Sequence, residues 1–175
     1  MKGKILIVDD EASARELFSG VFGKEGYEVI TAEGGNQALD ILRNDNIDVI
    51  FLDLKLFGMN GIDLCRQIRK TKPVSIIFAI TGWGPLFEIE ECREAGFDDY
   101  FEKPLDMDAM LVIVEEAFKK LARWKRRCAK ATSSRCASSR PGPAPGCHNC
   151  WTSWPSWHPV RRRPALCPTR KPRHR

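Results

Sequence analysis

Hydrophobic residues gather in five short runs along the first 124 residues, at positions 4–8, 28–32, 48–52, 75–80 and 99–101. The runs are rich in β-branched and aromatic side chains, and most are continuous instead of alternating with polar residues. Continuous runs of this length are typical of parallel strands that are covered on both faces. We therefore predict five buried parallel strands.

Helical patterns separate the predicted strands. Apolar residues recur at spacings of three and four, most regularly in the last segment, at Met107, Met110, Leu111, Val114, Phe118 and Leu121. Residues 86–95 hold four glutamates and predict a solvated, marginal helix. Strands that alternate with helices imply right-handed crossover connections, so the predicted fold is α/β, a doubly wound five-stranded parallel sheet with five helices.

Polar residues stand where the predicted strands end. Asp9 and Asp10 follow the first strand, Asp53 the third and Thr81 the fourth, while the fifth runs into Lys103. In an open parallel sheet these ends meet at one edge, where ligands bind. Each residue alone has an ordinary explanation, such as Asp10 at a helix N-terminus or Lys103 as surface charge. Their coincidence instead predicts a Mg²⁺ site, because three carboxylates repel one another without a cation and Mg²⁺ prefers oxygen ligands.

The loop after Asp53 has its own signals. Gly58 and Gly61 permit a tight turn beside the predicted metal, and Asn60 with Gly61 predicts the start of the third helix.

Charge divides the chain sharply. Residues 1–124 contain all 23 acidic residues and 15 of the 28 Lys and Arg, a net charge of −8, whereas residues 125–175 contain the other 13 and no acid. After residue 130 there is no Ile, Met, Phe or Tyr. Such a segment buries too little apolar surface to offset its ordering entropy. We predict one folded domain over residues 1–124 and a disordered basic tail over 125–175.

Three interpretations of the tail stay open. Cys147 and Cys150 resemble half of a zinc site, although the spacing of the remaining Cys and His residues is irregular. Three tryptophans at residues 151–157 and three arginines at 161–163 could bind single-stranded nucleic acid or an anionic membrane. The composition fits best an out-of-frame reading of a GC-rich message or an artificially added segment, since the tail has no hydrophobic period.

The start of the chain indicates a cytoplasmic protein. It has too few apolar residues for a signal peptide, and no run of about 18 apolar residues indicates a membrane span. A dinucleotide- or flavin-binding protein is disfavoured, because Asp9, Asp10 and Glu11 put negative charge where a pyrophosphate needs glycines and backbone amides.

Four motifs resemble the receiver domain of two-component response regulators. They are ILIVDDE at 5–11, DVIFLDLKLFGMNG at 48–61, AITG at 79–82 and AGFDDYFEKP at 95–104. Their order and spacing are similar to those of the family over residues 4–122. The resemblance implies a flavodoxin-like sheet with strand order 2-1-3-4-5. The sequence departs from the family at one position of the loop after Asp53, because Phe57 stands where the family usually has a proline that stiffens it.

The resemblance implies a role for each residue at the sheet edge. Asp53 would be the phosphoacceptor, which is the central catalytic residue. Asp9, Asp10, Asp53 and the backbone carbonyl of Lys55 would bind Mg²⁺, the implied cofactor.

The same resemblance implies how the signal passes. Thr81 and Lys103 would contact the phosphoryl group on Asp53 as the other two catalytic residues, and Thr81 with Tyr100 would act as the switch. The phosphoryl group would come from the phosphohistidine of a sensor histidine kinase or a histidine phosphotransfer protein. A downstream protein would bind the face formed by the fourth helix, fifth strand and fifth helix, and phosphorylation could also cause dimerisation.

We therefore expect a phospho-accepting switch of a two-component or phosphorelay system and not a metabolic enzyme. Its only catalysis would be its own phosphotransfer and autodephosphorylation. The alternative is a receiver-gated regulator that binds nucleic acid through the basic tail.

Overall fold

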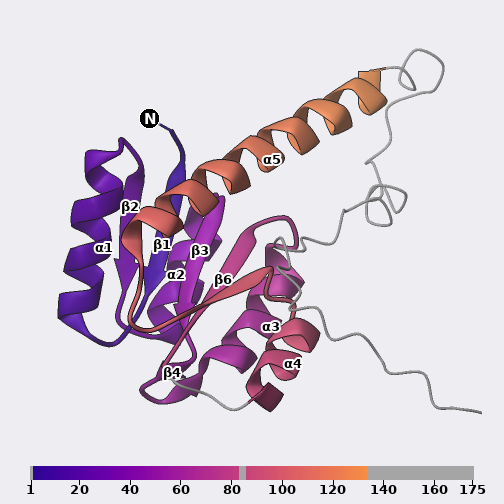
Figure 1. The fold of residues 1–175 in the computed structure, drawn as a ribbon. Coiled ribbons are helices and arrows are strands. Elements are labelled where there is room, and N and C mark those ends of the chain that lie inside the picture. The colour runs from indigo at the N-terminus through magenta and orange to yellow at the C-terminus, as the bar shows by residue number, and fades with distance from the viewer. Residues whose placement is uncertain (1, 83–85, 134–175) are drawn as a thin grey trace, which may run out of the picture.

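The computed structural model describes residues 2–82 and 86–133, which form one parallel sheet with helices on both faces (Figure 1). The strands of the sheet are β1 (Lys4–Val8), β2 (Glu28–Ala32), β3 (Val49–Asp53), β6 (Ile76–Thr81) and β7 (Asp99–Glu102). The helices are α1 (Ala12–Lys24), α2 (Gly35–Asn44), α3 (Gly61–Thr71), α4 (Leu86–Ala95) and α5 (Met107–Ser133). Two short strands, β4 (Lys55–Leu56) and β5 (Met59–Asn60), form a separate hairpin.

The sheet has five parallel strands in the order β2-β1-β3-β6-β7. Since β6 and β7 are its fourth and fifth strands, the predicted order 2-1-3-4-5 is confirmed. Strand β3 lies at the centre, between β1 and β6, and all five of its residues are buried. Asp53 therefore ends the central strand of the sheet.

Two apolar cores cover the two faces of the sheet. Alternate residues of β1 face opposite ways, so Ile5 and Ile7 pack in the core under α1 and α5, while Leu6 and Val8 pack in the core under α2, α3 and α4. Both cores have fully buried strand residues, which explains why the hydrophobic runs are continuous. Buried sheets of this kind hold the ends of their strands in fixed positions.

Helix α5 extends beyond residue 124, where the predicted domain ends. The sequence analysis began the tail at residue 125, but α5 continues to Ser133, so residues 125–133 are helical. The loss of acidic residues does not stop a helix, because Lys, Arg and Ala are good helix formers and residues 105–140 contain no Pro or Gly. Lys125 also pairs with Asp48 at 2.5 Å. The rest of the predicted tail, with its Cys and Trp motifs, lies outside the described residues.

Arg69 on α3 ties that helix to the loop between α4 and β7. Its Nε donates to the carbonyl oxygen of Gly96 at 2.7 Å, and its Nη1 donates to that of Ser75 at 2.5 Å. Its Nη2 donates to Asp98 Oδ2 at 2.6 Å, and the same oxygen accepts from the backbone N–H of Ile77 at 2.8 Å. The end of α4 is thereby fixed to α3 and to the sheet.

Within the described residues, each helix is too short or too polar to cross a membrane.

Candidate functional site

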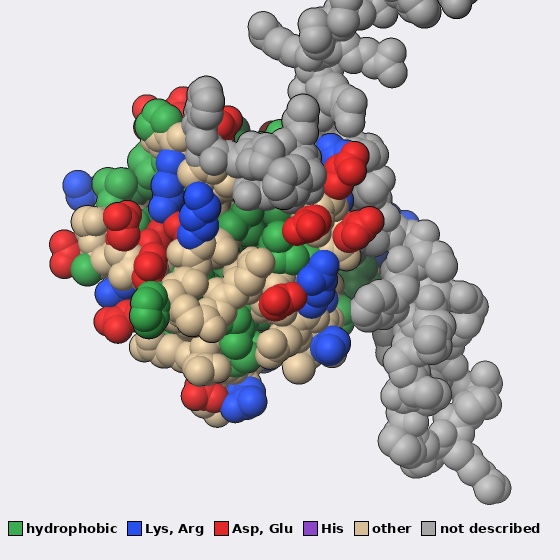
Figure 2. Space-filling view, turned by 90° about the horizontal axis from the view of Figure 1, so that it is seen from below, with side chains coloured by type: hydrophobic (Ala, Val, Ile, Leu, Met, Phe, Trp, Pro, Cys, Tyr) green, Lys and Arg blue, Asp and Glu red, His purple; other side chains and the backbone are tan. Residues whose placement is uncertain are grey.

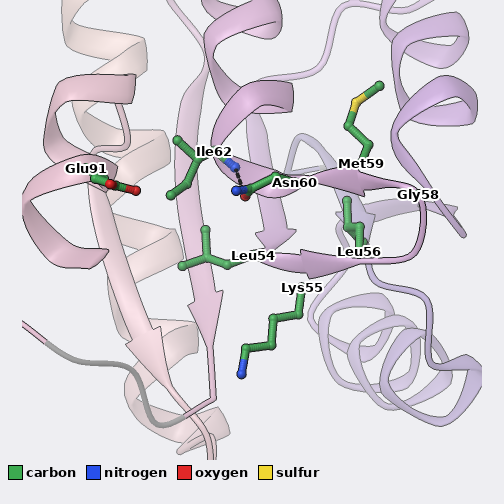
Figure 3. Close-up of a pocket in the computed structure, with 8 residues that line it drawn as sticks. All are labelled: Leu54, Lys55, Leu56, Gly58, Met59, Asn60, Ile62 and Glu91. Carbon is green, nitrogen blue, oxygen red and sulfur yellow. Dashed lines mark hydrogen bonds between the residues drawn. The ribbon is translucent and has the colours of Figure 1, made fainter. Parts of the chain in front are cut away.

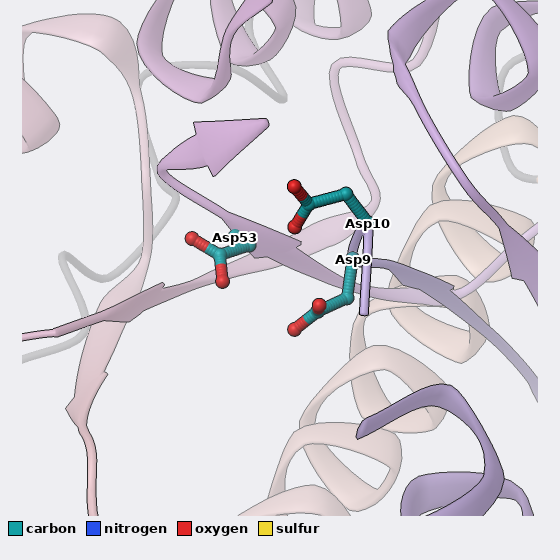
Figure 4. A group of neighbouring side chains, drawn as sticks. All are labelled: Asp9, Asp10 and Asp53. Carbon is teal, nitrogen blue, oxygen red and sulfur yellow. The ribbon is translucent and has the colours of Figure 1, made fainter. Parts of the chain in front are cut away.

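Three carboxylates meet at the edge of the sheet where the strands end. Asp9 and Asp10 follow β1, Asp53 ends β3, and their ligand oxygens lie within 4.8 Å of one another (Figure 4). Asp9 is fully buried, Asp53 is 4% exposed and Asp10 is exposed. The structure thus brings together the three acids that the strand-end argument selected.

Lys103 adds the positive charge to this cluster. Its Nζ donates to Asp53 Oδ2 at 2.7 Å and lies 3.5 Å from Asp9 Oδ2. Burial lowers the pKa of Lys103, but the hydrogen bond to Asp53 and the charges of Asp53, Asp9 and Glu11 outweigh burial and raise the pKa above its usual value. Lys103 therefore stays protonated. A cis peptide bond joins it to Pro104.

The cluster carries more negative than positive charge. Burial raises the pKa of Asp9, although the hydrogen bond from the Glu11 amide and the charge of Lys103 lower it. Asp9 Oδ1 accepts from that amide at 2.8 Å, whereas the buried Oδ2 has no hydrogen-bond partner. An orphaned buried oxygen beside two further carboxylates fits a divalent cation that prefers oxygen ligands. Mg²⁺ therefore fits the residues present.

The hairpin after Asp53 was not predicted, although its glycine was. Strands β4 and β5 pair in antiparallel fashion around Phe57 and Gly58, and Gly58 has a φ of 81°, which is a backbone conformation that favours glycine (Figure 3). Phe57 is 92% exposed. The side chain of Asn60 accepts from the backbone N–H of Ile62 at 3.0 Å and so caps α3, as the sequence predicted.

The same hairpin orients Asp53 and Lys55. The backbone N–H of Lys55 donates to Asp53 Oδ1 at 2.7 Å. Gly61 N donates to the carbonyl oxygen of Leu54, so in an alternating ladder the next pair, Lys55 with Asn60, is not hydrogen-bonded. The carbonyl oxygen of Lys55 is therefore not taken up by the hairpin, which suits its predicted role as a ligand.

Gly61 is required by close packing and not by its φ angle. A Cβ there would collide with the backbone oxygen of Asp53 and would lie 2.8 Å from Leu54 Cα. We expect Gly61→Ala to lower the free energy of unfolding by about 2 kcal/mol, measured by urea denaturation. Gly20→Ala is the matched control: no atom lies within 4 Å of its new Cβ in α1, so we expect a gain of about 0.5–1 kcal/mol. Equal effects of the two substitutions would contradict the packing argument.

The two predicted switch residues lie on neighbouring strands. Thr81 ends β6, next to Asp53 on β3, and its hydroxyl donates to the carbonyl oxygen of Gly82 at 2.5 Å. Tyr100 lies on the edge strand β7 and is 41% exposed. The predicted loop segment at residues 83–85, between Thr81 and α4, lies outside the described residues.

The surface around the hairpin is mixed in character. Figure 2 views the molecule from below Figure 1 and shows acidic and basic side chains around apolar patches. A groove of about 470 Å³ runs between the hairpin and α4, and its lining includes the apolar Leu54 and Ile62 and the charged Lys55 and Glu91 (Figure 3). Open space therefore separates the hairpin from α4.

Residues 5–115 match the family described as response regulator receiver domain. This match covers more than half of the chain and includes every residue of the carboxylate cluster. The chain belongs to the response regulator receiver family. It is accordingly a receiver domain of two-component signalling, a switch and not a metabolic enzyme.

Curated relatives differ in how much of their length the match covers. Sporulation initiation phosphotransferase F of Bacillus subtilis is 40% identical over 108 residues, which cover 62% of this chain and 87% of that protein. The DNA-binding response regulator MtrA of Mycobacterium tuberculosis is 39% identical over 104 residues, which cover 59% of this chain and 45% of that protein. This receiver chain thus spans less than half of MtrA.

Solved receiver structures share the fold. A CheY-like receiver domain protein from Methanospirillum hungatei aligns with a TM-score of 0.67 and 27% identity, over 69% of this chain and 97% of the other. Chemotaxis protein CheY4 of Vibrio cholerae aligns with a TM-score of 0.63 and 26% identity, over 66% of this chain and 98% of the other. Receiver domains bind Mg²⁺ in an acidic pocket and interact with sensor kinases or phosphotransfer proteins.

The sequence analysis missed one side chain of this receiver site. Arg15 on α1 donates to the backbone carbonyl oxygens of Asp9 and Asp10. Its place in the sequence, one turn into a helix, gave no sign of this contact, because such a residue more often faces solvent.

Proposed function

We propose that the chain takes a phosphoryl group from the phosphohistidine of a sensor histidine kinase or phosphotransfer protein onto Asp53. The supporting observation is the hydrogen bond of 2.7 Å between Lys103 Nζ and Asp53 Oδ2, beside the carboxylates of Asp9 and Asp10. The other oxygen of the same carboxylate is held too, because the backbone N–H of Lys55 donates to Asp53 Oδ1. The nucleophile is thereby oriented from both sides.

The transfer breaks the phosphorus–nitrogen bond of the donor and forms a phosphorus–oxygen bond to Asp53. The imidazole leaves with the electron pair of the broken bond. Lys103 is placed to neutralise charge on the transferring oxygens. Asp9, Asp10, Asp53 and the carbonyl of Lys55 would hold Mg²⁺, which supplies further positive charge to those oxygens.

The switch in this proposal begins at Thr81. Its hydroxyl now donates to Gly82, and in the phosphorylated chain it would donate to a phosphoryl oxygen instead. Such a change of partner would favour one of two states of the carboxyl end of β6 and of the helix that follows it, and the groove beside Glu91 leaves open space next to α4. Tyr100 would then turn inward from its exposed position. A downstream protein, or a second copy of the chain, would bind the altered face of α4, β7 and α5.

Intact-protein mass spectrometry tests the proposal. After incubation with acetyl phosphate and Mg²⁺, we expect one added phosphoryl group per chain, and we expect none when EDTA removes the Mg²⁺. A phosphorylated sensor kinase serves as a second donor. Failure of both donors in the presence of Mg²⁺ would contradict the proposed function.

A further inference from the structure

Arg15 contacts the backbone of the loop that carries two of the three clustered carboxylates. Its Nη1 donates to the carbonyl oxygens of Asp9 at 2.8 Å and Asp10 at 3.0 Å, and its Nη2 pairs with Glu33 at 3.2 Å. The side chain of Arg15 is 14% exposed and that of Glu33 is 77% exposed. The two carbonyls therefore hold the guanidinium more firmly than Glu33 does, because an exposed ion pair contributes little.

Other contacts hold this loop only in part. Glu11 is the N-cap residue of α1, but its side chain makes no capping hydrogen bond. Asp9 N donates to the carbonyl oxygen of Ala32 at 3.2 Å, and Glu11 N donates to Asp9 Oδ1 at 2.8 Å. The bond from Glu11 N–H holds the Asp10–Glu11 peptide plane, and the bond to the carbonyl oxygen of Ala32 holds the Val8–Asp9 plane. The Asp9–Asp10 plane between them is held by the bond from Arg15 to the carbonyl oxygen of Asp9.

We propose that Arg15 is a positioning residue for Mg²⁺ binding. By holding both carbonyl oxygens, it fixes the two peptide planes after β1 and so directs the side chains of Asp9 and Asp10 toward the metal. Arginine suits this role because its rigid, planar group carries five N–H donors and no acceptor, whereas the lysine ammonium lacks that fixed geometry. The inference rests on the metal-binding part of the proposed function.

Charge and geometry predict opposite effects of removing Arg15. A guanidinium close to the carboxylates repels Mg²⁺, so charge alone predicts tighter binding when it is removed. Loss of a contact that orients a metal ligand instead weakens metal binding by about 10- to 100-fold. The direction of the change in Kd therefore separates a positioning role from a purely electrostatic one.

Calorimetric titration of the full chain with Mg²⁺ measures this change. We expect Arg15→Met to raise the Kd at least about tenfold. Arg15→Lys keeps the charge and loses the planar group, so it should raise the Kd by a smaller factor. Glu33→Gln is the matched control, because it removes the ion pair and leaves both carbonyl bonds, and we expect a Kd within about twofold of wild type.

The outcomes distinguish the inference from the proposed function. A Kd for Arg15→Met equal to or below that of the wild-type chain would overturn the positioning role. If circular dichroism shows that Arg15→Met does not fold, the same comparison is made with Arg15→Lys, and an unchanged or lower Kd again overturns it. A wild-type chain that binds no Mg²⁺ would overturn the proposed function and this inference with it.

Discussion

Replacement of Asp53 by asparagine is expected to abolish phosphoryl uptake from acetyl phosphate in the presence of Mg²⁺. The amide is a poor nucleophile and lacks the charge that Lys103 now contacts at 2.7 Å. Removal of a nucleophile lowers a rate by at least about a thousandfold, so intact-protein mass spectrometry should detect no product. Asp63→Asn on α3 is the control, because its carboxylate is exposed and pairs with Arg66, and this variant should take up one phosphoryl group.

The competing acceptors are Asp9 and Asp10, whose oxygens lie within 4.8 Å of the Asp53 carboxylate. Lys103 forms a hydrogen bond with Asp53 and only a longer contact, of 3.5 Å, with Asp9. This difference favours Asp53 as the acceptor, because charge neutralisation is strongest at the shorter distance. Phosphoryl uptake by the Asp53→Asn protein at the wild-type rate would assign the acceptor role to one of these neighbours.

Arg69→Met is expected to lower the free energy of unfolding by about 3 kcal/mol near neutral pH. The side chains of Arg69 and Asp98 are only 20% and 15% exposed, so removal of the guanidinium leaves a largely buried carboxylate without its cation. It also leaves the carbonyl oxygens of Gly96 and Ser75 without their donor. Urea denaturation measures the loss, with Arg66→Met as the control. Arg66 is exposed and pairs with Asp63, so its replacement should change stability by less than about 0.5 kcal/mol.

The effect of Arg69→Met should depend on pH. Burial already raises the pKa of Asp98, and Arg69 lowers it in part. Without Arg69, the pKa of the folded state lies further above that of the unfolded chain, so stability falls as pH rises through it. We expect a larger loss at pH 8 than at pH 5, and a smaller loss in the double variant Arg69→Met, Asp98→Asn, which has no unpaired charge. A loss independent of pH would contradict this explanation.

The fold and the carboxylate cluster were predictable from local patterns in the chain. Strands that are buried on both faces have continuous apolar sequences. Because the strands are parallel, the residues at their carboxyl ends lie at one edge of the sheet, and this does not depend on the sequences of the helices. Three site residues were found in this way. Asp9 directly follows β1, Asp53 is the last residue of β3, and Thr81 is the last residue of β6. The tight turn at Gly58 was predicted from a different local signal, the freedom of glycine to adopt a positive φ.

Contacts between distant segments were not predictable. Arg15 and Arg69 look alike in the sequence as basic residues within helices, and only the packed structure shows that both donate to backbone carbonyl oxygens. The hairpin of β4 and β5 has strands of two residues each, too short for a period to appear. The continuation of α5 past residue 125 was not predicted either, because the charge boundary there is not a helix boundary.

The length of α5 has a mechanical consequence. Beyond Lys125, which pairs with Asp48 at the start of the central strand, the helix continues to Ser133, a span of about 12 Å at the rise of an α-helix. A helix is stiff over this distance, so it works as a lever arm: tilting it by about 10° at Lys125 would carry its tip sideways by about 2 Å. The tilt of α5 against the sheet therefore sets where residues 126–133 lie, and loss of the Lys125–Asp48 pair would shift the last fixed point of the helix back toward the buried Leu121.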